Sequence, residues 1–81
     1  MNVLIYSKKD CPSCVKAKSL LNIRGIAFRE SVIGEDILRE DFTTTFPDVR
    51  TAPFIIIDGV KIGGFEQLRE YLDNKPEYLA G

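Results

Sequence analysis

A short apolar run followed by the segment Cys11–Cys14, with sequence CPSC, constrains this chain more than any other feature. Val3–Tyr6 is continuous and rich in branched residues, which is typical of a strand buried on both faces. After Pro12 the apolar residues recur at helical spacing, and Gly25 follows as a residue suited to end a helix. Because proline is favoured at the first position of a helix, the pattern predicts a helix from Pro12 with Cys11 as its N-cap.

This placement gives the two cysteines different chemistry. The side chain of an N-cap residue faces the unpaired N–H groups two and three residues later, here those of Ser13 and Cys14. A thiolate at Cys11 would also lie at the positive end of the helix dipole, and such surroundings lower the pKa of a cysteine thiol. We therefore expect Cys11 to be the nucleophile and Cys14, deeper on the helix, to be the resolving thiol.

Three other roles for the two cysteines are alternatives to redox chemistry. Half of a zinc site is one, but a closed site needs four ligands and the chain has no histidine. A structural disulfide is another, although so short a loop constrains the unfolded chain very little. Unreactive apolar filler is the third. The strand-then-helix context favours redox chemistry over all three.

Size and charge narrow the class of protein further. Eighty-one residues make one domain, 1–81, and a net charge of −1 gives no electrostatic footprint for nucleic acid or an anionic membrane. No apolar run approaches the ~18 residues of a membrane span, and nothing resembles a signal peptide. A single reactive cysteine pair fits a reducing compartment, so we expect a cytoplasmic protein. We also expect a monomer.

The remaining chain predicts five further elements. A second strand is expected over residues 26–32, parallel to the first, and a helix over roughly 36–45, ended by Pro47. Residues 53–57 are the most apolar segment, with the proline at the start of the strand, and Asp58-Gly59 predicts a hairpin to a strand over 60–62. A last helix is expected over about 65–74, followed by a loose tail over about 75–81. The predicted class is α/β, in the order βαβαββα.

Four motifs in register now resemble one family, the small dithiol glutaredoxins of bacteriophages, in the thioredoxin superfamily. They are SKKDCPSC after the first strand, FPDVRTAPF before the third, IDG at the hairpin and IGGFEQL at the last helix. The resemblance implies the thioredoxin fold, a four-stranded mixed sheet in the order 2-1-3-4 with two helices on one face and one on the other. It also implies a cis peptide bond between Ala52 and Pro53.

The resemblance implies a glutathione site as well. Lys8 stands where the family has a lysine for the glycyl carboxylate, and Ala52 would pair through its backbone with the cysteinyl part of glutathione. The residues implied to bind glutathione are Lys8, Arg50, Thr51, Ala52, Pro53, Gly64, Phe65, Glu66 and Gln67, with Pro12 and Ser13 structural at the active site. Two residues depart from the family: Gln67 replaces the acid that meets the γ-glutamyl ammonium, and Ser13 replaces a tyrosine.

The expected function is a glutathione-dependent thiol–disulfide oxidoreductase that reduces protein disulfides and glutathione mixed disulfides. The resemblance implies no tightly bound cofactor, no metal, glutathione as reductant, and disulfide proteins such as ribonucleotide reductase as acceptors. One alternative is a thioredoxin-like donor reduced by thioredoxin reductase, which Ser13 and Gln67 favour. A second is an iron–sulfur cluster held through Cys11 across a dimer, and a third is a non-catalytic adaptor.

Overall fold

The computed structural model describes residues 1–74, so the predicted loose tail over 75–81 lies outside the described residues. The described chain forms seven elements: β1 (Val3–Ser7), α1 (Pro12–Ile23), β2 (Arg29–Val32), α2 (Arg39–Thr45), β3 (Phe54–Ile57), β4 (Val60–Gly63) and α3 (Phe65–Asp73). The order βαβαββα is the predicted one.

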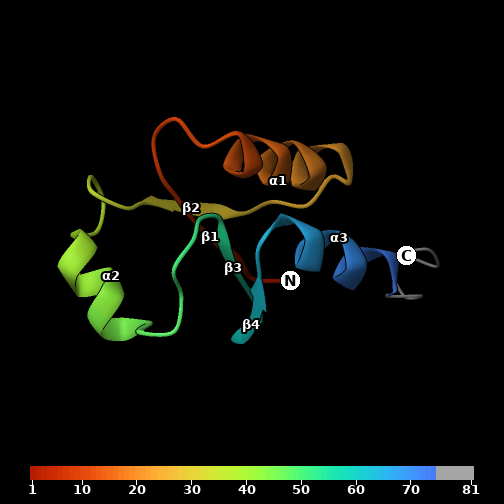
Figure 1. The fold of residues 1–81 in the computed structure, drawn as a ribbon. Coiled ribbons are helices and arrows are strands. Elements are labelled where there is room, and N and C mark those ends of the chain that lie inside the picture. Colours follow the sequence, from red (N-terminus) through yellow and green to blue (C-terminus); the bar gives the residue numbers. More distant parts are fainter. Residues whose placement is uncertain (75–81) are drawn as a thin grey trace.

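The four strands form one mixed sheet in the order β2-β1-β3-β4 (Figure 1). β1 is parallel to β2 and antiparallel to β3, and β4 pairs antiparallel with β3. β1, α1 and β2 therefore form a βαβ unit, in which the helix crosses over one face of the sheet. Asp58 and Gly59 both have positive φ, of 50° and 81°, which is the backbone of the tight hairpin turn that this dipeptide predicts.

The main core lies between the sheet and the helices α1 and α3. Alternate residues of β1 and β3 point to this face, and each helix adds one buried stripe. The buried core residues are Val3, Ile5, Ala17, Leu21, Ile55, Ile57, Leu68 and Leu72, each no more than 2% exposed. The predicted arrangement of two helices on one face is therefore confirmed, with α2 on the other.

The opposite face of the sheet is covered by α2 through aromatic rings. Tyr6 and Phe54, which point to this face, contact Phe42 and Phe46 from the α2 segment. Ring centroids lie 5.0 to 6.3 Å apart, and most pairs are tilted or edge-on, the geometry that aromatic rings prefer. This aromatic cluster attaches α2 to the strands that end at the active site.

The second strand is shorter than predicted, because it begins at Arg29 rather than at residue 26. Gly25, at φ 70°, ends α1, and its N–H donates to the carbonyl of Asn22 while that of Ile26 donates to Leu21. These two bonds are a Schellman cap, so the N–H of Ile26 is used by the helix end and not by the sheet. Ile26 and Phe28 still pack on the core, from a loop.

The second helix is also shorter, because α2 begins at Arg39 rather than at residue 36. The carbonyl of Val32 accepts the N–H groups of Glu35 and Asp36, and the Asp36 carboxylate accepts the N–H of Val32 at 2.8 Å. These bonds close a tight turn directly after β2. The acidic residues that suggested a helix start therefore hold a turn, which delays the helix by three residues.

Candidate active site

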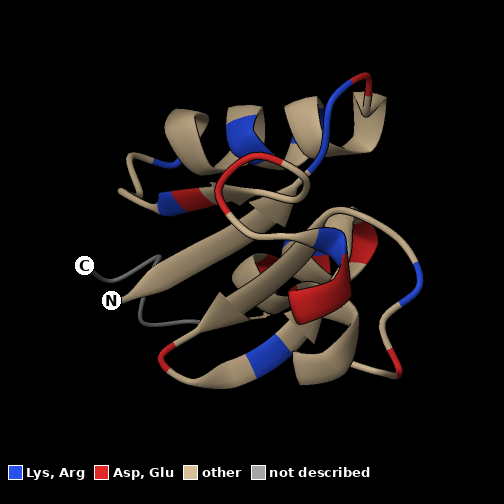
Figure 2. Cartoon of the chain, turned by 90° about the vertical axis from the view of Figure 1, so that its left-hand side faces the viewer, with Lys and Arg blue, Asp and Glu red and all other residues tan. Residues whose placement is uncertain are grey.

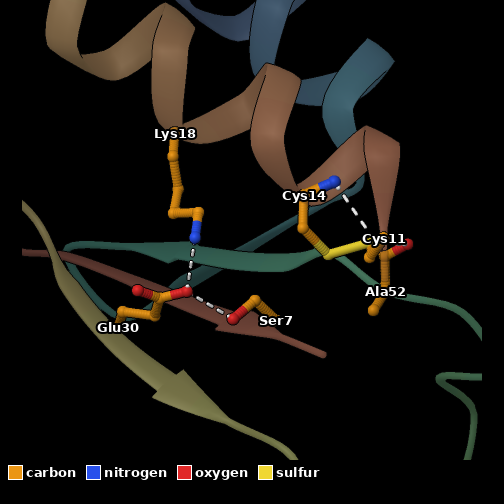
Figure 3. Close-up of a disulfide and its surroundings, with 6 residues drawn as sticks. All are labelled: Ser7, Cys11, Cys14, Lys18, Glu30 and Ala52. Carbon is orange, nitrogen blue, oxygen red and sulfur yellow. Dashed lines mark hydrogen bonds and ion pairs between the residues drawn. A yellow bond between two sulfur atoms is a disulfide. The ribbon is translucent and has the colours of Figure 1, made fainter. Parts of the chain in front are cut away.

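The two cysteines form a disulfide at the N-terminus of α1 (Figure 3). Cys11 is the N-cap residue, with extended backbone, and Pro12 is the first residue of the helix. The N–H of Cys14 donates to the sulfur of Cys11 at 3.2 Å. The predicted N-cap geometry is confirmed, and it directs the N–H of Cys14 at the sulfur of Cys11.

The two cysteines differ in how exposed they are. Cys11 is 8% exposed and Cys14 is 1% exposed, while Pro12 and Ser13 between them are exposed. Val15, at the next position, leaves 59% of its surface in solvent. Cys11 is therefore the more accessible of the two cysteines and is bordered by exposed residues, whereas Cys14 is almost fully buried.

The loop before β3 lies against the reactive sulfur. The Ala52–Pro53 peptide bond is cis, as the resemblance implied, and the carbonyl oxygen of Ala52 lies 3.6 Å from the sulfur of Cys11. The start of α3 is close to the same loop, because a side-chain carbon at Gly64 would lie 3.6 Å from the carbonyl oxygen of Pro53. The loop before β3 thus lies close both to Cys11 and to the start of α3.

A polar network lies under the disulfide and connects α1 with the two strands below it (Figure 3). The buried hydroxyl of Ser7 donates to Glu30 at 2.6 Å, and the Lys18 ammonium donates to the same carboxylate oxygen at 2.8 Å. The Lys18 ammonium, and then the Ser7 hydroxyl, lower the pKa of Glu30, although partial burial opposes this. Lys18 lies one helical turn after Cys14, so the network fixes the helix that carries the disulfide.

The loop between β1 and Cys11 holds two lysines in different states. Asp10 turns the chain with a φ of 54°, a conformation that aspartate tolerates better than most residues. Lys9 forms an exposed ion pair with Glu35 at 3.1 Å. Lys8 forms no salt bridge with any carboxylate of residues 1–74 and instead lines a pocket.

This pocket, called the basic pocket below, has a volume of about 560 Å³ and lies between α2, the loop before α1 and the loop before β3. Its polar lining includes Lys8, Arg39 and Arg50, while Phe42 contributes part of its wall. Figure 2 shows basic segments on this side of the molecule in the loop before α1, at the start of α2 and in the loop before β3. Ala52 is also in the lining, so the basic pocket reaches the residue beside Cys11.

Of the residues expected to bind glutathione, Lys8, Arg50, Thr51 and Ala52 are brought together in the basic pocket. Arg39 lines it too and was not predicted, because it was placed inside a longer helix. It is the first residue of α2, where the helix dipole disfavours a cation. An arginine at that position is therefore a signal of function, but only once the start of the helix is known.

The expected residues at α3 are engaged in other contacts. The side-chain oxygen of Gln67 accepts the N–H of Gly64 at 3.0 Å, which caps the helix. Glu66 forms an ion pair with Arg69 at 2.8 Å, one helical turn later. Gly64, Phe65, Glu66 and Gln67 do not line the basic pocket.

The described residues 1–74 hold neither a cluster of metal-ligating side chains nor a membrane-spanning helix. No three His, Cys, Asp or Glu residues in that range are grouped so that they could hold a metal ion. None of the described helices has the length and apolar character needed to cross a membrane.

Comparison with known proteins gives one consistent result. The family model for glutaredoxin matches residues 3–62, which include β1, the disulfide and the cis-proline loop. The chain is 37% identical over 67 residues to glutaredoxin 3 of Escherichia coli (strain K12), a match that covers 83% of this chain and 81% of that protein. It is 36% identical over 76 residues to the hybrid peroxiredoxin hyPrx5 of Haemophilus influenzae, covering 86% of this chain but only 29% of that longer protein.

Solved structures agree with the sequence comparisons. The structure of glutaredoxin 1 from Francisella tularensis, complexed with cacodylate, is similar with a TM-score of 0.77 and 32% identity. The match covers 99% of this chain and 98% of that one. The similarity therefore extends over the whole arrangement of the sheet and the helices.

Proposed function

The chain belongs to the glutaredoxin family of thiol–disulfide oxidoreductases, and we propose that its reductant is glutathione and that Cys11 is the attacking thiol. The Cys11 thiolate attacks a substrate disulfide, forming a mixed disulfide and releasing the first substrate thiolate. The Cys14 thiolate then attacks the sulfur of Cys11 and releases the second. The substrate gains two electrons, and the protein is left with the Cys11–Cys14 disulfide.

Two glutathione molecules restore the dithiol. The first attacks the sulfur of Cys11, which forms a Cys11–glutathione disulfide and frees the Cys14 thiol. The second attacks the sulfur of the bound glutathione, so that oxidised glutathione leaves and Cys11 is again a thiolate. A substrate that is already a glutathione mixed disulfide requires Cys11 alone.

One observation carries this proposal: the sulfur of Cys11, the more exposed of the two cysteines, lies 3.6 Å from the carbonyl oxygen of Ala52, which also lines the basic pocket. An extended peptide can pair with backbone groups such as those of Ala52. Glutathione has two carboxylates, and Lys8, Arg50 and the unpredicted Arg39 offer cations for one of them. Thr51 and Pro53 flank the pairing residue and complete this part of the site.

The γ-glutamyl end of glutathione is assigned to the start of α3. The N–H group of Phe65 suits a carboxylate, because it lies at the positive end of the helix, whereas the N–H of Gly64 already donates to Gln67. Glu66 is assigned to the γ-glutamyl ammonium, in place of the acid that Gln67 replaces. We further propose a monomer that works in the cytoplasm, and ribonucleotide reductase as one protein acceptor.

The contacts at α3 favour a second candidate, a donor reduced by thioredoxin reductase. Gln67 is occupied by the helix cap and Glu66 by Arg69, so the ammonium of glutathione meets no unpaired acid there. A weak hold on the γ-glutamyl end would reduce the advantage of glutathione over a protein reductant.

NADPH consumption distinguishes the two candidates. The protein is assayed with glutathione, glutathione reductase and a glutathionylated peptide, and separately with thioredoxin reductase and a protein disulfide. Turnover in the first assay that disappears in Cys11→Ser supports the proposal. Turnover only with thioredoxin reductase would replace it with the second candidate.

A further inference from the structure

The basic residues of this chain divide into two groups by their partners. Four of the described cations form ion pairs elsewhere, namely Lys9, Lys18, Arg24 and Arg69, and Lys61 lies over the ring of Phe46. Lys8, Lys16, Arg29, Arg39 and Arg50 form no salt bridge with a carboxylate of residues 1–74, and three of them, Lys8, Arg39 and Arg50, meet in the basic pocket. Three unpaired cations in one hollow of a chain whose net charge is −1 indicate an anionic ligand.

No carboxylate lines the basic pocket to neutralise the charge of these three cations. The acidic side chains nearest in sequence are absent from the lining: Asp10, Glu40, Asp41 and Asp48 do not line the pocket, Glu35 is paired with Lys9, and Asp36 holds the turn after β2. The hydroxyl-bearing residues Thr43 and Thr51 add hydrogen-bonding capacity. The volume of about 560 Å³ is in the range of pockets that bind small-molecule ligands.

The position of the basic pocket restricts what the anion can belong to. Ala52 is one of the lining residues, and its carbonyl oxygen lies 3.6 Å from the sulfur of Cys11. A ligand that extends from that sulfur into the pocket is a chain in which a cysteine is followed or preceded by negative charge. A free nucleotide or phosphate would pair with the cations but would not use the sulfur of Cys11.

We propose that the basic pocket selects protein disulfides whose reactive cysteine has acidic residues, or a chain-terminal carboxylate, within about two positions on one side. The inference rests on the proposed function, because it names the substrate of the same Cys11 sulfur. Opposite charges raise the local concentration of such a segment and hold it while Cys11 attacks. Neutral or basic flanks lose that contact and react more slowly.

The test uses single turnover, so that it does not depend on glutathione. Reduced Cys14→Ser protein is mixed with peptides whose only cysteine carries a 2-thiopyridyl group. The Cys11 thiolate attacks the peptide sulfur, a Cys11–peptide disulfide forms, and pyridine-2-thione leaves and is measured by its absorbance. Peptides with Asp-Asp before or after the cysteine are compared with Asn-Asn counterparts, and each rate is divided by that of mercaptoethanol with the same peptide.

One of the two acidic peptides should react roughly 5- to 20-fold faster than its Asn-Asn counterpart at low salt, as expected for two partly exposed ion pairs. The preference should shrink towards unity near 1 M salt, where the screening length is only about 3 Å. It should also fall below about twofold in Arg39→Gln/Arg50→Gln, with Arg39→Gln alone between the two. Arg29→Gln, which removes the same charge outside the basic pocket, should keep the preference.

Equal normalised rates for acidic and neutral peptides would overturn the inference, as would a preference that survives in Arg39→Gln/Arg50→Gln. An equal loss in Arg29→Gln would reduce it to an effect of net charge. A failure of glutathione as reductant appears instead in the NADPH assay and leaves these rates unchanged, so the two failures are distinguishable.

Discussion

Removing Glu30 should destabilise the protein more than its partly exposed position suggests. Glu30→Ala takes away the acceptor of the Ser7 hydroxyl, and Ser7 is only 2% exposed. A buried hydroxyl without a partner costs about 1–3 kcal/mol. The ion pair with Lys18, whose side chains are each 31% exposed, adds only about 0.2–1 kcal/mol. We expect the free energy of unfolding to fall by about 2–3 kcal/mol.

The matched variant is Ser7→Ala, which removes the donor and leaves Glu30 with Lys18 and water. Its expected loss is smaller, about 0.5–1.5 kcal/mol, because no buried polar group is left without a partner. In the double variant the stranded hydroxyl no longer exists. Its loss should therefore be smaller than the sum of the two single losses, which is the signature of a direct interaction.

Urea unfolding of the oxidised protein, followed by circular dichroism, measures these differences, provided that the transition is two-state. The thermal midpoint of Glu30→Ala should fall by roughly 10–20 °C, since 1 kcal/mol corresponds to about 4–8 °C in a domain of this size. A loss below about 0.5 kcal/mol in Glu30→Ala would refute the reasoning, because the Ser7 hydroxyl would then have another partner. Additive single losses would refute it as well.

Three further predictions concern other parts of the molecule. Because Lys18 and Ser7 lower the pKa of Glu30, this carboxylate stabilises the fold above its unfolded pKa and loses that effect as pH falls through its lower folded pKa. Unfolding free energies measured across the acid range should therefore fall more steeply in wild type than in Glu30→Gln, and parallel curves would contradict this. Phe42→Ala should cost about 3–5 kcal/mol in urea unfolding, because the ring is the buried centre of the aromatic cluster, whereas Leu38→Ala, at a residue 65% exposed, should stay within about 0.5 kcal/mol. Gln67→Asp keeps a side-chain acceptor for the helix cap and adds a carboxylate, so the KM for a glutathionylated peptide should fall several-fold with little change in kcat; an unchanged KM would mean that the ammonium binds elsewhere.

The sequence alone predicts the reactive end of α1 closely. Pro12 determines where the helix begins, so the N-cap role of Cys11 and the bond from Cys14 follow from local rules. The order of the elements follows from periodicity and from turn residues such as Gly25 and Asp58. The strand order and the cis bond before Pro53 do not follow from local rules or periodicity. They were expected only because the resemblance to a family implied them.

The predicted starts of β2 and α2 are wrong because the same residues suit two different local structures. Glu35 and Asp36 suit a helix N-terminus but instead close the turn after β2, which moves the helix start to Arg39. Ile26 belongs by composition to a strand, yet its N–H completes the cap of α1. In both cases a backbone hydrogen bond decided the outcome, and residue types do not reveal which partner that bond will have.

Long-range polar contacts were also beyond sequence reasoning. Ser7 and Glu30 are 23 residues apart, and no spacing rule connects them before the pairing of β1 with β2 is known. Arg39 has the same character, because only the fold brings it beside Lys8 and Arg50, which the resemblance had already assigned to one site.

Trapping of the first mixed disulfide tests the central claim, that Cys11 attacks and Cys14 resolves. Reduced Cys14→Ser and Cys11→Ser proteins are incubated with oxidised glutathione, and the intact mass is followed with time. Rapid addition of one glutathione to Cys14→Ser, with slow addition to Cys11→Ser, is the predicted result. Addition to Cys11→Ser that is as fast or faster would make the buried Cys14 the nucleophile and contradict the account.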